Sequence, residues 1–167
     1  MTPSDQHRNR ALVIALGGVE PWERTATPTY AVMHKEDTGR VVVTETTKAP
    51  RQQTNEFDFI ASLDRRYAPR FFLVDASLPK HFLDAVRSEL GYRGIPLRLI
   101  AQSHPGRDRL DLIHHLFRLE RLDVTRAVDL AHPHAVDAVT LGFTHLNAPP
   151  PVVYHFAPDR SGRLGRW

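Results

Sequence analysis

Two aspartates stand where carboxylates could meet in a folded α/β protein. Asp75 follows the apolar run Phe71–Val74, and Asp137 lies in the first turn of a predicted helix, between Val136 and Ala138. In open α/β sheets, ligands gather outside the carboxyl ends of the central strands. Carboxylates that converge there hold hard divalent cations, which activate water and stabilise the leaving oxygen of a phosphodiester. The two residues therefore indicate a hydrolytic metal site.

Histidines and basic residues flank both aspartates. His132 and His134 precede Asp137 and could bind a transition metal, but we expect them beside the metal ligands rather than among them. Four basic residues are candidates for contacts with phosphate groups: Lys80, His81, Arg107 and Arg109. Such contacts need only a charge and a donor at the right distance. A solvated surface is the simpler explanation for any one of them.

The composition is that of one soluble globular domain, with 167 residues, 41% of them hydrophobic and 25% charged. The chain has no cysteine, which excludes disulfides, thiolate metal sites and cysteine nucleophiles. Of its 22 basic residues only three are Lys. The arginine fork suits a polyanionic partner, although GC-rich codon usage gives the same bias. No apolar run approaches the roughly 20 residues needed to cross a bilayer, and the polar N-terminus lacks the apolar core of a signal peptide, so we expect no membrane association and a cytoplasmic location.

The order of apolar and polar segments predicts an α/β fold, a mixed sheet with helices on both faces. The predicted strands span residues 11–16, 29–34, 40–46, 71–74 and 96–101, and the predicted helices span residues 56–67, 79–90, 107–119 and 133–146. The second and third strands form a hairpin around a polar turn that ends at Gly39, and Asn55 can cap the first helix. We expect a disordered lead over residues 1–10, the domain over 11–147, and an extended or disordered Pro-, Gly- and Arg-rich tail over 148–167.

Three stretches, in this order, resemble the nuclease domain of phage large terminases, a branch of the RNase H-like nucleases. They are VIALGG at the first strand, FFLVDASLPKHFLDAV around Asp75 and HPHAVDAVTLGF around Asp137. The resemblance covers Ala11–Leu146 and implies an RNase H-like mixed sheet, with an antiparallel hairpin plus parallel strands. It also implies a metal-dependent DNA endonuclease of DNA packaging, with two Mg²⁺ or Mn²⁺ ions and with Asp75 and Asp137 as ligands. The implied partners are double-stranded DNA, the terminase ATPase domain, the small terminase subunit and the portal, in the cytoplasm of a host cell.

Ala15 stands where that family has its first catalytic Asp, and a methyl group cannot coordinate a metal. The loss of a bridging ligand should cost several kcal/mol of transition-state stabilisation, and at ~1.4 kcal/mol per tenfold this lowers the rate about a thousandfold or more. Glu20 and Glu23, after the first strand, are the acids that could replace it. The resemblance therefore implies an impaired nuclease, and an Ala15→Asp variant that cuts DNA much faster than this chain.

Two alternatives stay open. A catalytically inactive RNase H-like module would bind DNA or a protein partner without cutting, and Ala15 favours it directly. A nucleotide-binding domain of the sugar-kinase and actin-like group would use LGGVE as a phosphate loop, but such enzymes need a second domain that closes over the nucleotide. DNA binding that is insensitive to Mn²⁺ would favour the first, and thermal stabilisation by a nucleotide would favour the second.

Overall fold

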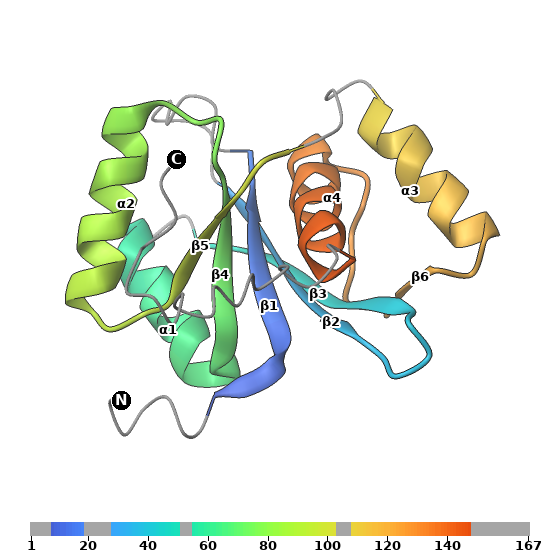
Figure 1. Cartoon of the computed structure of the whole chain (residues 1–167), viewed down its shortest axis with the longest axis horizontal. Helices are drawn as coiled ribbons and strands as arrows, with labels where there is room; N and C mark the ends of the chain where they lie inside the picture. The colour runs from blue at the N-terminus through green and yellow to red at the C-terminus, as the bar shows by residue number, and fades with distance from the viewer. Residues whose placement is uncertain (1–7, 19–27, 51–54, 103–107, 148–167) are drawn as a thin grey trace, which may run out of the picture.

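The computed structural model of the chain describes residues 8–18, 28–50, 55–102 and 108–147 (Figure 1). Its strands are β1 (Asn9–Gly17), β2 (Thr29–Lys35), β3 (Val41–Lys48), β4 (Pro69–Asp75), β5 (Leu97–Ile100) and β6 (Leu122–Val124); its helices are α1 (Glu56–Tyr67), α2 (Lys80–Tyr92), α3 (Arg109–Arg118) and α4 (Pro133–Leu146). Each predicted strand and helix has a counterpart among them. None of these helices is long and apolar enough to span a membrane. The predicted tail, residues 148–167, lies outside the described residues.

The six strands form one mixed sheet in the order β5-β4-β1-β2-β3-β6. The first three strands are antiparallel, because β1 pairs with β2 and β2 with β3. By contrast, β4 is parallel to β1, β5 to β4, and β6 to β3. The predicted mixed sheet, with an antiparallel hairpin plus parallel strands, is confirmed. The three-residue strand β6 was not predicted, because so short a run shows no periodicity and becomes a strand only through its partner.

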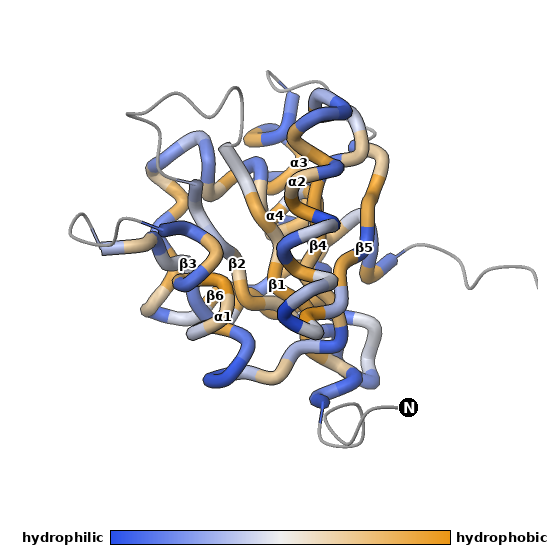
Figure 2. Tube along the Cα trace, turned by 90° about the vertical axis from the view of Figure 1, so that its left-hand side faces the viewer, coloured by the Kyte–Doolittle hydropathy of each residue, from blue (hydrophilic) through white to orange (hydrophobic). Residues whose placement is uncertain are grey.

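Helices cover both faces of the sheet, as predicted. Helices α1 and α2 pack on one face, over a core that includes Ile14 and Phe72. Helices α3 and α4 pack on the other face, over a core that includes Val13 and Leu73 (Figure 1). Neighbouring residues of a strand point to opposite faces, so β1 and β4 contribute to both cores. This explains why both strands have continuous apolar runs, and Figure 2 shows them as largely hydrophobic (orange).

Helix α1 begins and ends where the sequence predicts. The side chain of Asn55 accepts a hydrogen bond from the backbone N–H of Phe57 at 2.9 Å, and Ala68 ends the helix with φ of 44°. The hydroxyl of Tyr30 in β2 donates to Glu56 at 2.7 Å. Burial and the adjacent Glu56 raise the pKa of Tyr30 well above its ordinary value, and burial raises the pKa of Glu56. This buried hydrogen bond ties the first turn of α1 to the sheet.

The first strand starts earlier than predicted. Strand β1 begins at Asn9, inside the expected lead of residues 1–10, and the backbone N–H of Asn9 donates to the carbonyl of Ala68 at 2.8 Å. Arg8 adds a bidentate ion pair with Asp64, with N–O distances of 2.6 and 3.2 Å. Polar residues extend the strand here because the end of α1 supplies partners for their backbone and side-chain groups.

Candidate active site at the ends of β1 and β4

Asp75 is the last residue of β4 and lies on the side of the sheet that carries α4. Leu73 pairs with Ala15 of β1 and packs in the core under α4. Side chains two residues apart share a face of a strand, so Asp75 continues this face at the carboxyl end. Its Oδ1 accepts two hydrogen bonds from Ser77, from the backbone N–H at 2.9 Å and from the hydroxyl at 2.8 Å. The turn after β4 thereby fixes the orientation of the carboxylate.

Asp137 lies in α4, which begins near the end of β1. It is the fifth residue of the helix, and the first turn holds no acidic residue. At 3.6 residues per turn the fifth residue belongs to the second turn, so the predicted first-turn position was wrong. Arg109 of α3 donates to Asp137 at 2.8 Å, and the two side chains are only 17% and 28% exposed. The charge of Asp137 is therefore compensated by a side chain of a neighbouring helix.

Glycines allow α4 to approach β1 closely next to Asp137. A Cβ on Gly17 would lie 2.1 Å from the carbonyl oxygen of His134 and 2.5 Å from the backbone nitrogen of Ala138. Gly18 has φ of 81°, and a Cβ there would lie 2.1 Å from the imidazole ring of His134. A side chain at either position would force the helix away from the strand. The glycine pair that ends the first strand thus allows the first turns of α4 to lie against β1.

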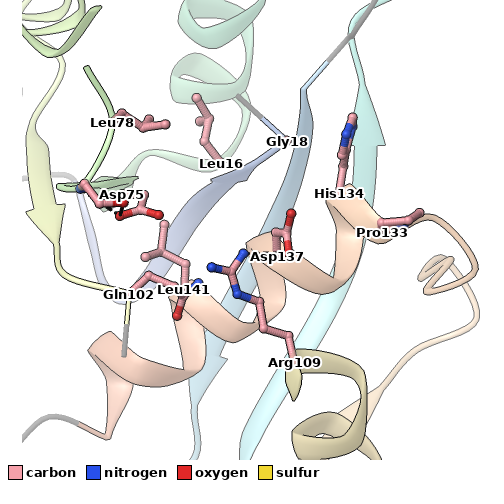
Figure 3. A pocket seen from close by; sticks show the side chains of 11 residues that line it. Leu16, Gly18, Asp75, Leu78, Gln102, Arg109, Pro133, His134, Asp137 and Leu141 are labelled. Carbon is pink, nitrogen blue, oxygen red and sulfur yellow. Dashed lines mark hydrogen bonds and ion pairs between the residues drawn. The ribbon is translucent and has the colours of Figure 1, made fainter. Parts of the chain in front are cut away.

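A pocket of about 520 Å³ opens between the ends of β1 and β4 and the first turns of α4 (Figure 3). Its charged and titratable lining comes from Asp75, Asp137, Arg109 and His134. Figure 3 shows the two carboxylates on opposite sides of the pocket, with the guanidinium of Arg109 beside Asp137. Nδ1 of His134 and Oε1 of Gln102 are buried and have no hydrogen-bond partner within the described ranges. Buried polar atoms are normally paired, so these two mark a place where a ligand could bind.

Ala15 lies under α4 rather than in the pocket. Its side chain is fully buried, and its Cβ lies 3.6 Å from the point that a Cβ on Gly142 would occupy. Gly17, two residues further along the strand, faces the same way and is level with Asp75. A carboxylate at position 15 would have to reach past the contact between strand and helix to join Asp75.

His132, Lys80 and His81 are not among the described residues that line the pocket. Nδ1 of His132 caps α4 by accepting from the backbone N–H of His134 at 3.2 Å. Desolvation and the nearby charges of Lys48 and His134 lower the pKa of His132. Lys80 and His81 are exposed in the first turn of α2, which packs on the opposite face of the sheet. The remaining candidates lie outside the described residues: Glu20, Glu23 and Arg107.

The pocket also contains polar residues that were not singled out in the sequence, among them Ser77 and Gln102. Gln102 follows the predicted strand 96–101, so the strand-end argument that selected Asp75 would have found it. Ser77 stands two residues after an aspartate, the spacing of a turn in which the carboxylate accepts from the following backbone. Both signals were present in the sequence.

The sequence matches no family model and no curated protein. Solved structures share its fold. T. thermophilus RuvC in complex with a Holliday junction substrate superposes with a TM-score of 0.53, at 14% identity, over 80% of this chain and 92% of that chain. The large terminase nuclease from the thermophilic phage G20c with bound zinc superposes with a TM-score of 0.53, at 14% identity, over 80% and 81%. The yeast mitochondrial Holliday junction resolvase Ydc2 gives 0.53, at 9% identity, over 83% and 80%.

The chain has an RNase H-like fold. This confirms the predicted RNase H-like mixed sheet with helices on both faces. Resolvases and a terminase nuclease superpose on the RNase H-like chain equally well, with TM-scores of 0.53. The structural comparison therefore establishes the fold and does not separate the terminase type from the resolvase type.

Asp75 and Asp137 are the residues of this pocket whose carboxylates could bind a divalent cation. Asp75 and Asp137 supply carboxylate oxygens, and His134 supplies a buried imidazole nitrogen without a partner in the described part of the chain. Within that same part, no group of three or more His, Asp or Glu side chains is placed to hold a metal ion. Arg109 also contacts one oxygen of Asp137 and would have to move before a cation could bind there. A second cation would need a further carboxylate, which Ala15 does not supply.

Proposed function

We propose that the pocket is the phosphodiester-hydrolysis site of a DNA endonuclease domain, and that its activity is impaired by Ala15. One observation carries the proposal: Asp75 and Asp137, from distant parts of the sequence, line one pocket where β1 and β4 end. This is the pole at which ligands of open α/β sheets bind. In this proposal Asp75 and Asp137 are the metal ligands, and Mg²⁺ or Mn²⁺ is the metal.

The solved structures with this fold support the choice of a divalent cation and of DNA. T. thermophilus RuvC holds a Holliday junction substrate, and the G20c terminase nuclease has been solved with zinc, cobalt and magnesium. We carry over a divalent cation and DNA as the substrate class. Our finer proposal is a terminase-type nuclease of DNA packaging, which rests on the three stretches that resemble that family. It would act with a terminase ATPase domain, a small terminase subunit or a portal, on double-stranded DNA.

In this proposal each side chain of the pocket has a separate role in hydrolysis. A bound divalent cation supplies an activated water and neutralises charge on the phosphodiester. Asp75 is oriented for binding by its two hydrogen bonds from Ser77. Arg109 neutralises Asp137 in the absence of a cation, and once released it lies close enough to the pocket to bind a phosphate oxygen. His134 and Gln102 line the same pocket.

The test combines metal binding with DNA cleavage. Mn²⁺ binding is measured by isothermal titration calorimetry for the unchanged chain, Asp75→Asn and Asp137→Asn, with exposed Asp84→Asn on α2 as the matched control. We expect the first two variants to lose Mn²⁺ binding at least tenfold, about 1.4 kcal/mol, and the control to bind normally. Cleavage is assayed on a labelled four-way junction and a linear duplex. Mn²⁺ binding that survives both pocket substitutions would overturn the proposal.

An inactive DNA- or protein-binding module is the second candidate. It is favoured by the ion pair between Arg109 and Asp137, which compensates the carboxylate without a metal. In that case the chain would shift DNA in a gel to the same extent with Mn²⁺ and with EDTA, and would cut neither substrate. Faster cutting with Mn²⁺ than with EDTA would exclude it.

A further inference from the structure

A cluster of positive and aromatic side chains lies on the same face of the sheet as the pocket. Phe71 of β4 is its centre, and the guanidinium carbons of Arg70 and Arg98 each lie 5.2 Å from the centroid of its ring. The ring of His145, in the last turn of α4, meets the ring of Phe71 edge-on, with centroids 6.1 Å apart. Both arginines are exposed and Phe71 is half-buried. We call these four residues the arginine–phenylalanine cluster.

The positive charge of the cluster is uncompensated within the described ranges. There, Arg70 and Arg98 have no carboxylate within 4 Å, in contrast to arginines such as Arg93 and Arg109. Several other exposed arginines of the described residues share this property, but they are not gathered around one ring. Desolvation and then the charges of Arg98 and Arg70 lower the pKa of His145. Two guanidinium groups held against one ring, without an acid, form a surface suited to an anion.

The cluster and the pocket are two ends of one strip of the sheet. Phe71, Leu73 and Asp75 alternate along the α4 side of β4, so about 13 Å of strand separates Phe71 from Asp75. Leu73 is fully buried under α4, so the accessible path from the cluster to the pocket runs beside it, over β5. On the neighbouring strand β5, Arg98 and Ile100 share this face, and Gln102 lines the pocket beyond them. Figure 1 shows β4 and β5 side by side, with β1 between them and α4.

We propose that this strip binds the phosphodiester backbone of DNA on one side of the pocket, with Arg70 and Arg98 contacting phosphates. The proposal rests on the proposed function and adds the path of the DNA to it. With the axis of a B-form duplex along the strip, a length of about 13 Å corresponds to about four base-pair steps at 3.4 Å of axial rise per step. The two arginines would therefore contact phosphates roughly four nucleotides from the phosphate in the pocket. Stacking on Phe71 holds both guanidinium groups in place before DNA binds, which lowers the entropy lost on binding.

The test measures binding of a fluorescein-labelled DNA duplex by anisotropy in EDTA, where no cutting occurs. Arg70→Gln and Arg98→Gln should each raise Kd about three- to tenfold and lower the slope of log K against log salt by about one. Arg87→Gln, an exposed arginine on α2, removes the same charge from the opposite face and should change Kd less than twofold. Arg98→Lys keeps the charge and should retain most of the affinity, which separates a phosphate contact from a folding defect.

A second readout follows the cluster directly. The pKa of His145, measured by NMR titration, should rise when the duplex is added, because phosphates neutralise the two arginines that lower it. Equal Kd values for Arg70→Gln, Arg98→Gln and Arg87→Gln would overturn the strip while leaving the pocket assignment intact. Equal affinity for polyglutamate of the same charge would also overturn it. If the chain without substitutions does not bind DNA at all, both the proposed function and the DNA-binding strip are overturned.

Discussion

The side chain of Ala15 is enclosed between β1 and α4, where nothing compensates a charge. Among the described residues, its neighbours across the strands are Ala31 and Leu73, and α4 covers it at Gly142. An aspartate here would be desolvated unless a cation or a proton neutralised it, and an unpaired buried carboxylate costs several kcal/mol. The resemblance associates an aspartate at position 15 with nuclease activity. We therefore expect Ala15→Asp to lower the stability of the fold as well.

We predict that Ala15→Asp lowers the free energy of unfolding by about 3 kcal/mol in EDTA, and that Mn²⁺ restores part of this loss. Ala15→Asn serves as the control, because asparagine has nearly the same volume as aspartate and carries no charge. Thermal unfolding by differential scanning fluorimetry, with EDTA and with Mn²⁺, gives the comparison. If Mn²⁺ raises Tm equally in both variants, a carboxylate at position 15 does not reach a cation in the pocket.

At the level of single residues, the sequence identified the two aspartates but not their partners. Asp75 could be found because it directly follows an apolar run, and Asp137 because it interrupts one. The contact between Asp137 and Arg109 joins two helices whose packing angle has no sequence signal. The enclosure of Ala15 likewise depends on the close approach of α4, which becomes visible only when both elements are placed.

Among the elements, α4 depends most on the strand beneath it. Glycines at positions 17 and 18 of the chain meet the first turns of α4 at distances that leave no room for a Cβ. By contrast, Gly91 lies near the end of α2, and a Cβ there would have no neighbouring atom within 4 Å among the described residues. The two helices therefore respond differently to the same substitution.

We predict that Gly17→Ala destabilises the fold by about 1–3 kcal/mol, because the methyl group meets backbone atoms that cannot rotate away. The matched variant Gly91→Ala should stabilise it by about 0.5–1 kcal/mol through helix propensity. Urea unfolding followed by circular dichroism measures both. A Gly17→Ala variant as stable as the unchanged chain would show that α4 does not lie this close to β1.

Element boundaries followed the sequence where a local signal fixed them. Asn55 and the apolar spacing predicted both ends of α1 correctly, and Pro133 predicted the first residue of α4 correctly. Strand β6 and the early start of β1 had no such signal, because both depend on partners supplied by other elements. Tertiary pairing, rather than propensity, made these residues strands.

In the whole molecule, the sheet order was the part least accessible to the sequence. The order of elements predicted a hairpin and parallel strands, and right-handed crossovers limit the possibilities. Nothing in the sequence indicated that β6 returns to pair with β3, on the edge opposite β5. The separation of the two cores agrees with the continuous apolar runs of β1 and β4, which the sequence does show and which indicate strands buried on both faces.

The lowered pKa of His145 predicts that the folded protein loses stability in acid. The folded-state pKa of His145 is lowered by desolvation, Arg98 and Arg70, so the unfolded chain binds more protons below the ordinary pKa of 6.5. The free energy of unfolding therefore falls as pH decreases from about 7 through the lowered pKa, and becomes constant below it.

We predict that His145→Gln loses less stability between pH 7 and pH 5 than the unchanged chain. Urea titrations at both pH values measure this, with exposed His114→Gln as control; an identical loss in all three proteins would contradict it.

The two outer strands of the sheet have a consequence for association between copies of the chain. β5 and β6 lie at the two edges and contain only four and three residues. Open edges are where separate molecules extend one another's sheets, and short edges offer few free backbone groups for this. Pairing of two copies along β5 or β6 would therefore form few backbone hydrogen bonds, which disfavours edge-to-edge aggregation of the described sheet.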